Sequence, residues 1–208
     1  AYDAESKERV EVLVDKFTMQ FHTASLLGST SSSRTIPQLY HRASQGDFRF
    51  VGNSALRIRR GANRQYAMAL LMDCASGATQ ARLDRIEEEA QETLLGQTIN
   101  FIFPDICKAC GDIDLGDEFR GPLNSDVPTL FISGTLDGRT SVANASALIP
   151  GFPNSEHVII DGAGHSDELF LSSPEILASM QAFMQGTAIS NRTIQLAPMS
   201  FAKPRFKK

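Results

Sequence analysis

The sequence predicts an α/β protein whose character changes near residue 118. Before this point, apolar residues recur mostly at helical spacing. After it, two short apolar runs alternate with helical patterns, and each run ends in a glycine turn. We therefore expect a mainly helical region over residues 1–118, an α/β segment with parallel strands over 119–186, and a basic tail over 187–208.

Three helices of the first region can be placed from local signals. Apolar residues from Val10 to Phe21 follow acidic residues and keep helical spacing. Thr35 is placed to cap a helix over residues 36–43. Residues 79–95 predict an acidic amphipathic helix that Gly96 ends, with its three consecutive glutamates on the solvated face and not in a catalytic cluster.

Two other stretches are less distinct. Residues 65–74 form a compact apolar run that fits either a helix or a strand. Residues 98–109 predict another helix, although Pro104 stands in its middle.

The second region has the pattern of strand, helix, strand, helix. Residues 129–133 form an apolar run after a proline, which suits a strand buried on both faces of a parallel sheet. Residues 157–161 form the second strand, and Pro174 opens the final helix, with Gly186 just beyond it. Two parallel strands would leave two open edges. We expect the sheet to continue in a partner, in residues outside this sequence, or in a second copy of the chain.

Composition excludes several classes of protein. The chain has 208 residues, 42% hydrophobic and 21% charged, which is ordinary for a globular protein. A net charge of −4 argues against a partner that is nucleic acid or an anionic membrane. No apolar run approaches the roughly 20 residues of a membrane helix. The start is not a signal peptide and lacks Met, which predicts a processed or truncated chain.

The three cysteines leave more than one arrangement open. Cys107 and Cys110 have the spacing of a redox or metal motif. A zinc site would need two further ligands, and the four histidines show no second paired motif, so we expect no metal or cofactor. A disulfide from Cys74 to one of the pair is favoured and would place the protein in a secreted or periplasmic setting. Buried free thiols are the alternative, which would fit the cytoplasm.

The two strands lead to an acid and a base. The first is followed by Gly134 and Asp137, and the second by a glycine loop and His165, 28 residues further on. An aspartate and a histidine in this arrangement are two members of a nucleophilic triad. We expect His165 to act as the general base and Asp137 to orient its ring. The nearby acidic residues Asp161, Asp167 and Glu168, and the histidine His157, are expected to be structural.

Residues 127–186, with Pro128 to Gly134, Asp137 and Gly162 to His165, resemble the last two strands and helices of an α/β-hydrolase. Most of residues 4–186 is similar to the tripeptidyl-aminopeptidase-like and proline-iminopeptidase-like branch of serine peptidases. There a helical cap precedes the acid strand. Residues 67–74 resemble the branch's cap segment that ends in cysteine, and residues 105–110 its second cysteine motif. The resemblance implies a helical cap followed by the C-terminal half of a hydrolase core, acting on a peptide or small acyl substrate.

The nucleophile of this family is absent from the chain. The family places its serine in Gly-x-Ser-x-Gly on a strand-to-helix turn. The only glycines four apart are Gly134 and Gly138, with Leu136 between them, and the fragment from Gly52 to Ser54 follows no predicted strand. In the family the serine precedes the acid and the histidine. We expect it upstream of Ala1 or on a separate chain, and the present chain alone to be inactive.

Two smaller departures concern specificity. The acid loop lacks the two prolines that often follow the family's aspartate, which costs it stiffness. Ala75 and Ser76 stand where the branch usually has an acidic residue, which weakens the case for an aminopeptidase. An esterase-type hydrolase and a non-catalytic binding or assembly module are the alternatives. A Gly-x-Ser-x-Gly segment upstream in the gene, or in a co-purifying chain, would distinguish the enzyme from the module.

Overall fold

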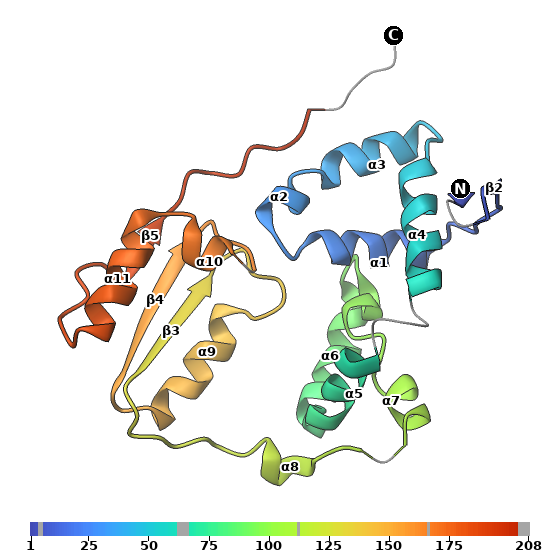
Figure 1. Cartoon of the computed structure of the whole chain (residues 1–208). Coiled ribbons are helices and arrows are strands. Elements are labelled where there is room, and N and C mark those ends of the chain that lie inside the picture. Colours follow the sequence, from blue (N-terminus) through green and yellow to red (C-terminus); the bar gives the residue numbers. More distant parts are fainter. Residues whose placement is uncertain (4–5, 62–66, 112, 166, 204–208) are drawn as a thin grey trace. The chain divides into compact units, whose positions relative to one another are not determined.

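The computed structural model describes residues 1–203 apart from 4–5, 62–66, 112 and 166. The chain is mixed α/β and divides into two compact units (Figure 1). The first unit comprises Ala1–Ser25 and Arg42–Gly121, and the second comprises Leu26–His41 and Pro122–Lys208. The change of unit after Gly121 lies close to residue 118, where the sequence pattern changes. Residues 26–41 group with the α/β segment and not with the helical region.

The first unit is mainly helical. Its short strands β1 (Tyr2–Asp3) and β2 (Glu8–Arg9) pair antiparallel. Its helical elements are α1 (Lys16–Leu26, whose last residue belongs to the second unit), α4 (Arg49–Gly61), α5 (Ala67–Ser76), α6 (Gln80–Glu92), the 3-10 turn η1 (Gly96–Ile99), α7 (Asp105–Ala109) and α8 (Gly116–Phe119).

A disulfide and an aromatic cluster hold this unit together. Cys74 of α5 is bonded to Cys107 of α7, while Cys110 keeps a free, half-buried thiol. This confirms the expected disulfide and decides which member of the pair forms it. Three phenylalanine rings pack together, with 5.2–6.0 Å between the ring centroids of Phe17, Phe21 and Phe101. The favourable packing of these rings adds to the area they bury.

Two predicted helices have different limits. The helix expected over residues 98–109 is wrong, because η1 ends at Ile99 and α7 begins only at Asp105. Pro104, at a cis peptide bond with Phe103, cannot donate to an α-helical carbonyl, and its ring would clash within a continuous helix. Helix α1 begins six residues after Val10, where Asp15 Oδ1 accepts the backbone N–H of Thr18 at 2.8 Å.

Two other helices lie close to the ranges that the sequence predicts. Helix α3 (Ile36–Ser44) and α6 agree closely with the predicted ranges. The ambiguous run at 65–74 is helical in α5, and its first two residues lie outside the described residues.

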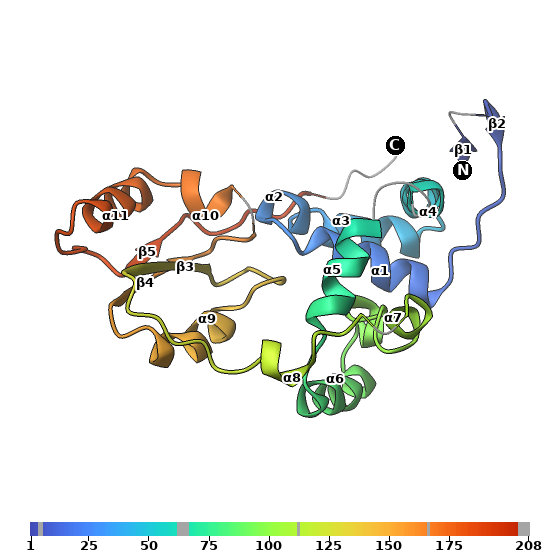
Figure 2. The same ribbon diagram turned by 60° about the horizontal axis from the view of Figure 1, so that its bottom comes forward.

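The second unit contains a parallel sheet. Among the described residues it has the order β3 (Thr129–Gly134), β4 (Ser155–Asp161) and β5 (Thr193–Gln195). Helix α9 (Val142–Leu148), followed by the 3-10 turn η2 (Ile149–Gly151), covers one face. Helices α10 (Glu168–Leu171) and α11 (Pro174–Met184) cover the other, as Figure 2 shows. The short helix α2 (Thr30–Ser33) also belongs to this unit.

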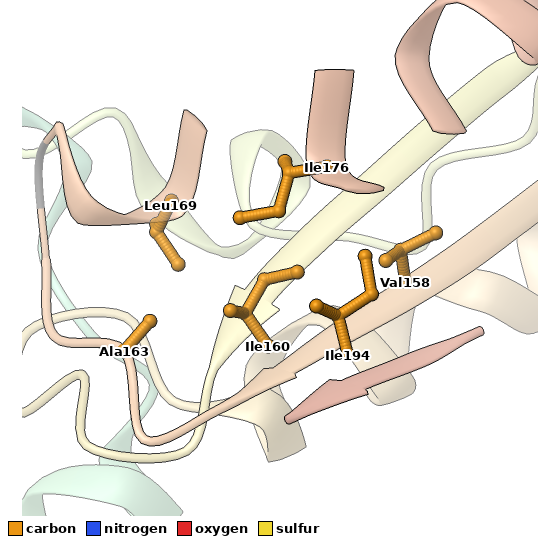
Figure 3. Close-up of a cluster of buried hydrophobic side chains, with 6 residues drawn as sticks. All are labelled: Val158, Ile160, Ala163, Leu169, Ile176 and Ile194. Carbon is orange, nitrogen blue, oxygen red and sulfur yellow. The ribbon is translucent and has the colours of Figure 1, made fainter. Parts of the chain in front are cut away.

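The core of this unit lies between the sheet and the last two helices. Val158 and Ile160 of β4 meet Ile194 of β5, Leu169 of α10 and Ile176 of α11 (Figure 3). These side chains are at most 6% exposed. Burying a side chain of this size contributes about 1.5–3 kcal/mol, so this cluster anchors the strand that leads to His165.

The third strand lies within the residues expected to form a basic tail. β5 pairs with β4 over Ile159↔Thr193 to Asp161↔Gln195, and Ile194 is 1% exposed. The two-strand expectation was therefore incomplete. A strand of three residues is too short for an alternating pattern to be recognised in the sequence. Within the part of the chain that the structure describes, β3 pairs only with β4, so its other edge is open.

Candidate active site

The acid loop begins where β3 ends. Its backbone turns back on itself, since Asp137 N–H donates to the Gly134 carbonyl at 3.2 Å. Leu136 N–H donates to the carbonyl of Ala163, in the loop after β4, at 2.9 Å. A Cβ added to Gly134 would collide with that same carbonyl oxygen. The absence of a side chain at Gly134 therefore allows the acid loop to lie directly against the base loop.

The base loop follows β4 and is fixed at its first residues. Gly162 has φ +89°, a conformation that glycine adopts without a steric penalty. Its N–H donates to Thr135 Oγ1 at 2.9 Å, and the Thr135 hydroxyl donates to Asp161 Oδ1 at 2.8 Å. Asp161 thus supports the turn, as the sequence predicted, and His165 follows three residues beyond Gly162.

The structure brings Asp137 and His165 together. Their Oδ2 and Nδ1 atoms are 2.9 Å apart, within hydrogen-bond distance. The Asp137 side chain is fully buried, while the His165 side chain keeps 31% of its surface exposed. Because β3 and β4 are parallel neighbours, the two loops meet at the carboxyl edge of the sheet, where ligands bind in open α/β sheets.

Further donors surround the Asp137 carboxylate. Oδ1 accepts the backbone N–H groups of Arg139 and Thr140, both at 2.8 Å. Oδ2 accepts the Thr140 hydroxyl at 2.7 Å in addition to the contact with His165. Burial alone would raise the pKa of Asp137, but these hydrogen bonds outweigh it and lower the pKa to about 2. The carboxylate is therefore ionised at neutral pH.

This hydrogen-bonded turn has a second consequence for the acid loop. The loop lacks the prolines that would stiffen it, yet residues 139 and 140 are tied to the aspartate by three hydrogen bonds. Thr140 is the residue whose hydroxyl and N–H both contribute. The expectations from the sequence did not include this role of Thr140. An Asx-type turn after an aspartate is the local signal that points to it.

The arrangement defines what the imidazole can do. An ionised carboxylate accepts hydrogen bonds only, so Nδ1 of His165 must be the donor to Asp137. In the neutral ring the basic lone pair then lies on Nε2. A partly exposed histidine in this tautomer is suited to take a proton from a hydroxyl group and return it to a leaving group.

The remaining candidates lie away from this pair. His157 lies in the middle of β4, not at its start, and its Nε2 atom is 3.0 Å from Ser133 Oγ. Burial lowers the pKa of His157, which favours the neutral ring. Gly52, Asn53 and Ser54 lie within helix α4 of the first unit, and Ser54 is buried, so they do not form a strand-to-helix nucleophile turn.

The described residues hold neither a metal cluster nor a membrane-spanning helix. In the described part of the chain, no group of three or more His, Cys, Asp or Glu side chains is arranged to hold a metal ion. None of the described helices is both long and apolar enough to cross a membrane.

Comparisons of this chain with family models, with curated proteins and with solved structures found no match. The hydrolase resemblance therefore depends on the motif residues and on the geometry that they adopt.

Proposed function

We propose that this chain carries the acid and the base of a serine hydrolase that cleaves peptide or small acyl bonds. The observation that supports this most strongly is the 2.9 Å contact between Asp137 and His165 at the carboxyl edge of a parallel sheet. A buried aspartate that orients a partly exposed histidine is the acid–base part of a Ser-His-Asp triad.

In the proposed reaction, Nε2 of His165 takes the proton of a serine hydroxyl as the oxygen attacks the acyl carbon. The imidazolium that forms is stabilised by the ionised Asp137 carboxylate. His165 then gives the proton to the leaving amine or alcohol, which leaves an acyl-enzyme. A water molecule, deprotonated by the same ring, releases the acid and restores the serine.

The nucleophile comes from outside these 208 residues in this proposal. The sequence has no Gly-x-Ser-x-Gly, although this turn is the family's usual site for the serine. The open edge of β3, which is where a further strand of a hydrolase sheet would pair, supports a contribution from another segment or chain. The same open edge also fits the alternative, a non-catalytic assembly module.

The cysteine motifs and the disulfide bear on the substrate class and the compartment. A peptidase of the proline-iminopeptidase type is the form of the proposal that the cysteine motifs and the helical cap favour, and an esterase is the alternative. The Cys74–Cys107 disulfide supports a secreted or periplasmic setting, because disulfides persist in oxidising compartments.

Labelling with a fluorophosphonate probe tests the proposal. The 208-residue chain alone should not be labelled, since it lacks the activated serine. The protein that includes the upstream coding sequence, or the complex with a co-purifying chain, should be labelled at a serine in Gly-x-Ser-x-Gly. Labelling of the purified chain itself would contradict the missing nucleophile. A longer protein or complex without such a serine would favour the assembly module.

A further inference from the structure

The loop that carries His165 is held by a segment from the beginning of the second unit. His165 N–H donates to the carbonyl of Gly28 at 2.9 Å. The N–H of the preceding residue, Gly164, donates to Glu168 Oε2 at 2.8 Å. Two consecutive backbone groups at the proposed base therefore have fixed partners, one on each of two different chain segments.

Glu168 joins these two segments. Its Oε1 atom accepts the N–H of Thr30 at 2.9 Å and the Thr30 hydroxyl at 2.8 Å. The N–H of Ser31 lies 3.5 Å from the same oxygen. These N–H groups belong to the first residues of α2, which have no partner inside the helix. The half-buried Glu168 carboxylate thus binds Thr30, 138 residues before it in the sequence, and Gly164, four residues before it.

The packing between the segments is close. A Cβ added to Gly164 would lie 3.0 Å from Ser29 Cα, 3.1 Å from Thr30 N and 3.0 Å from Glu168 Oε2. Only a residue without a side chain allows this approach of two backbones. The backbone immediately before His165 is therefore restricted by both packing and hydrogen bonds.

We propose that Glu168 is a positioning residue for His165. Together with residues 28–31, it fixes the backbone of Gly164 and His165, and so keeps Nδ1 of the ring on the Asp137 carboxylate. The proposal deepens the proposed function, because it gives a site residue that works through the base. A displacement of about 1 Å in a catalytic group costs about a hundredfold in rate, which is why such a support matters.

The chemistry of the carboxylate suggests the variant. An ionised glutamate has two oxygens that accept, whereas glutamine has one accepting oxygen and an NH₂ that donates. In Glu168→Gln the amide can serve either Gly164 or Thr30, and its NH₂ group then faces the other N–H. The side-chain volume is almost unchanged. Asp167→Asn is the matched control, because it removes an exposed carboxylate from the adjacent residue. The Asp167 side chain makes no capping hydrogen bond to the N-terminus of α10.

Nuclear magnetic resonance on the full 208-residue chain tests the proposal without a nucleophile. At a pH where the ring is neutral, the ¹⁵N shifts of His165 in the unaltered chain should show the single tautomer with the proton on Nδ1. In Glu168→Gln the tautomers should become mixed, and amide exchange at Gly164 and His165 should become at least about tenfold faster. Asp167→Asn should leave both unchanged.

Several results would overturn the positioning role. One is a Glu168→Gln chain that keeps the single tautomer, whether or not amide exchange becomes faster. Another is an Asp167→Asn chain with the same changes, because the cause would then be general charge. If Glu168→Gln does not fold, Thr30→Val decides the matter. This variant removes the hydroxyl donor to Glu168 and keeps the backbone N–H. It should mix the His165 tautomers and speed amide exchange to a smaller degree than Glu168→Gln. An unchanged His165 tautomer in Thr30→Val overturns the proposal.

The two proposals fail separately. A chain in which Glu168 controls the tautomer, but whose completed form is never labelled by a fluorophosphonate, retains the positioning role and loses the hydrolase. A completed enzyme that is labelled, with a tautomer insensitive to Glu168, retains the hydrolase and loses the positioning role.

Discussion

At the scale of single residues, the proposed chemistry depends on the hydrogen bonds that one buried carboxylate accepts. Asp137 accepts from two backbone N–H groups, from the Thr140 hydroxyl and from His165. A buried carboxylate with so many donors is held ionised and in one orientation. The imidazole consequently has a fixed tautomer, and its basic nitrogen is determined by the fold.

The pKa of Asp137 predicts a loss of stability in acid. Its folded value of about 2 lies below the ordinary value of 3.8, so the folded state binds the proton less tightly than the unfolded state. The stabilisation is complete above pH 4 and is lost as the pH falls from about 4 to about 2. A shift of this size is worth about 2 kcal/mol. Urea unfolding of the second unit between pH 7 and pH 2 measures it.

Asp137→Asn is the variant that isolates this contribution. It should be less stable at pH 7 and should lose less free energy of unfolding between pH 4 and pH 2 than the unaltered chain. Asp167→Asn, which removes an exposed carboxylate nearby, should follow the unaltered chain. An identical acid dependence in the Asp137→Asn and unaltered chains would contradict the hydrogen-bonded carboxylate.

The sequence pattern predicts the two proposed site residues, Asp137 and His165, but not the contacts that hold them. Asp137 and His165 each follow a short apolar run and a glycine turn, which is a local pattern. Glu168 was expected only to have a structural role. Of its two partners, Thr30 precedes β3 and Gly164 follows β4 in the sequence. No local sequence pattern connects residues so far apart. Contacts of this kind arise from tertiary packing.

At the scale of elements, the close approach of the β3 and β4 loops leads to a prediction for Gly134. In Gly134→Ala the new methyl would meet the Ala163 carbonyl and would lie 2.9 Å from Leu169 Cδ2. Backbone must move to relieve this contact, which should cost about 1–3 kcal/mol in the free energy of unfolding. Thermal and urea unfolding of the second unit measure this change.

Gly28→Ala is the matched control in the same unit. Nothing lies within 4 Å of a Cβ at this position, so its free energy of unfolding should change by less than about 1 kcal/mol. Equal stability of the Gly134→Ala and unaltered chains would show that the two loops are not packed as described.

The disulfide makes a prediction for the first unit. Cys74 and Cys107 are 33 residues apart, and closing a loop of this length removes entropy from the unfolded chain worth about 4 kcal/mol. Reduction, or Cys107→Ser, should lower the melting temperature of this unit. Cys110→Ser should leave it unchanged, because Cys110 is a free thiol. If Cys110→Ser has the larger effect, the assigned pairing is wrong.

The success of element prediction depended on length and on local signals. β3 and β4 are apolar runs of sufficient length, and their ends agree with the structure to within two residues. β5 has three residues, only one of them apolar, and gains its stability from Ile194 in the core. No continuous helix crosses Pro104, because the missing proline N–H and the ring clash outweigh the helical spacing of the apolar residues.

At the scale of the whole chain, the division into units follows contacts that local patterns do not contain. Residues 26–41 precede most of the helical region, yet they belong to the unit of the sheet. Their hydrogen bonds with His165 and Glu168 are among the contacts that link them to this unit. The second unit also leaves one edge of β3 unpaired within the described residues, which agrees with a proposed partner segment that carries the nucleophile.

In the proposed function, Asp137 and His165 perform acyl transfer with a serine from outside this chain. This is tested by kcat of the completed enzyme that carries His165→Ala. The control is His157→Gln, which alters a histidine within β4 whose Nε2 atom lies near Ser133 Oγ, away from the pair. His165→Ala should lower kcat by about a thousandfold or more, with the control within tenfold of the unaltered enzyme. A decrease of less than tenfold in His165→Ala would contradict its role as the base.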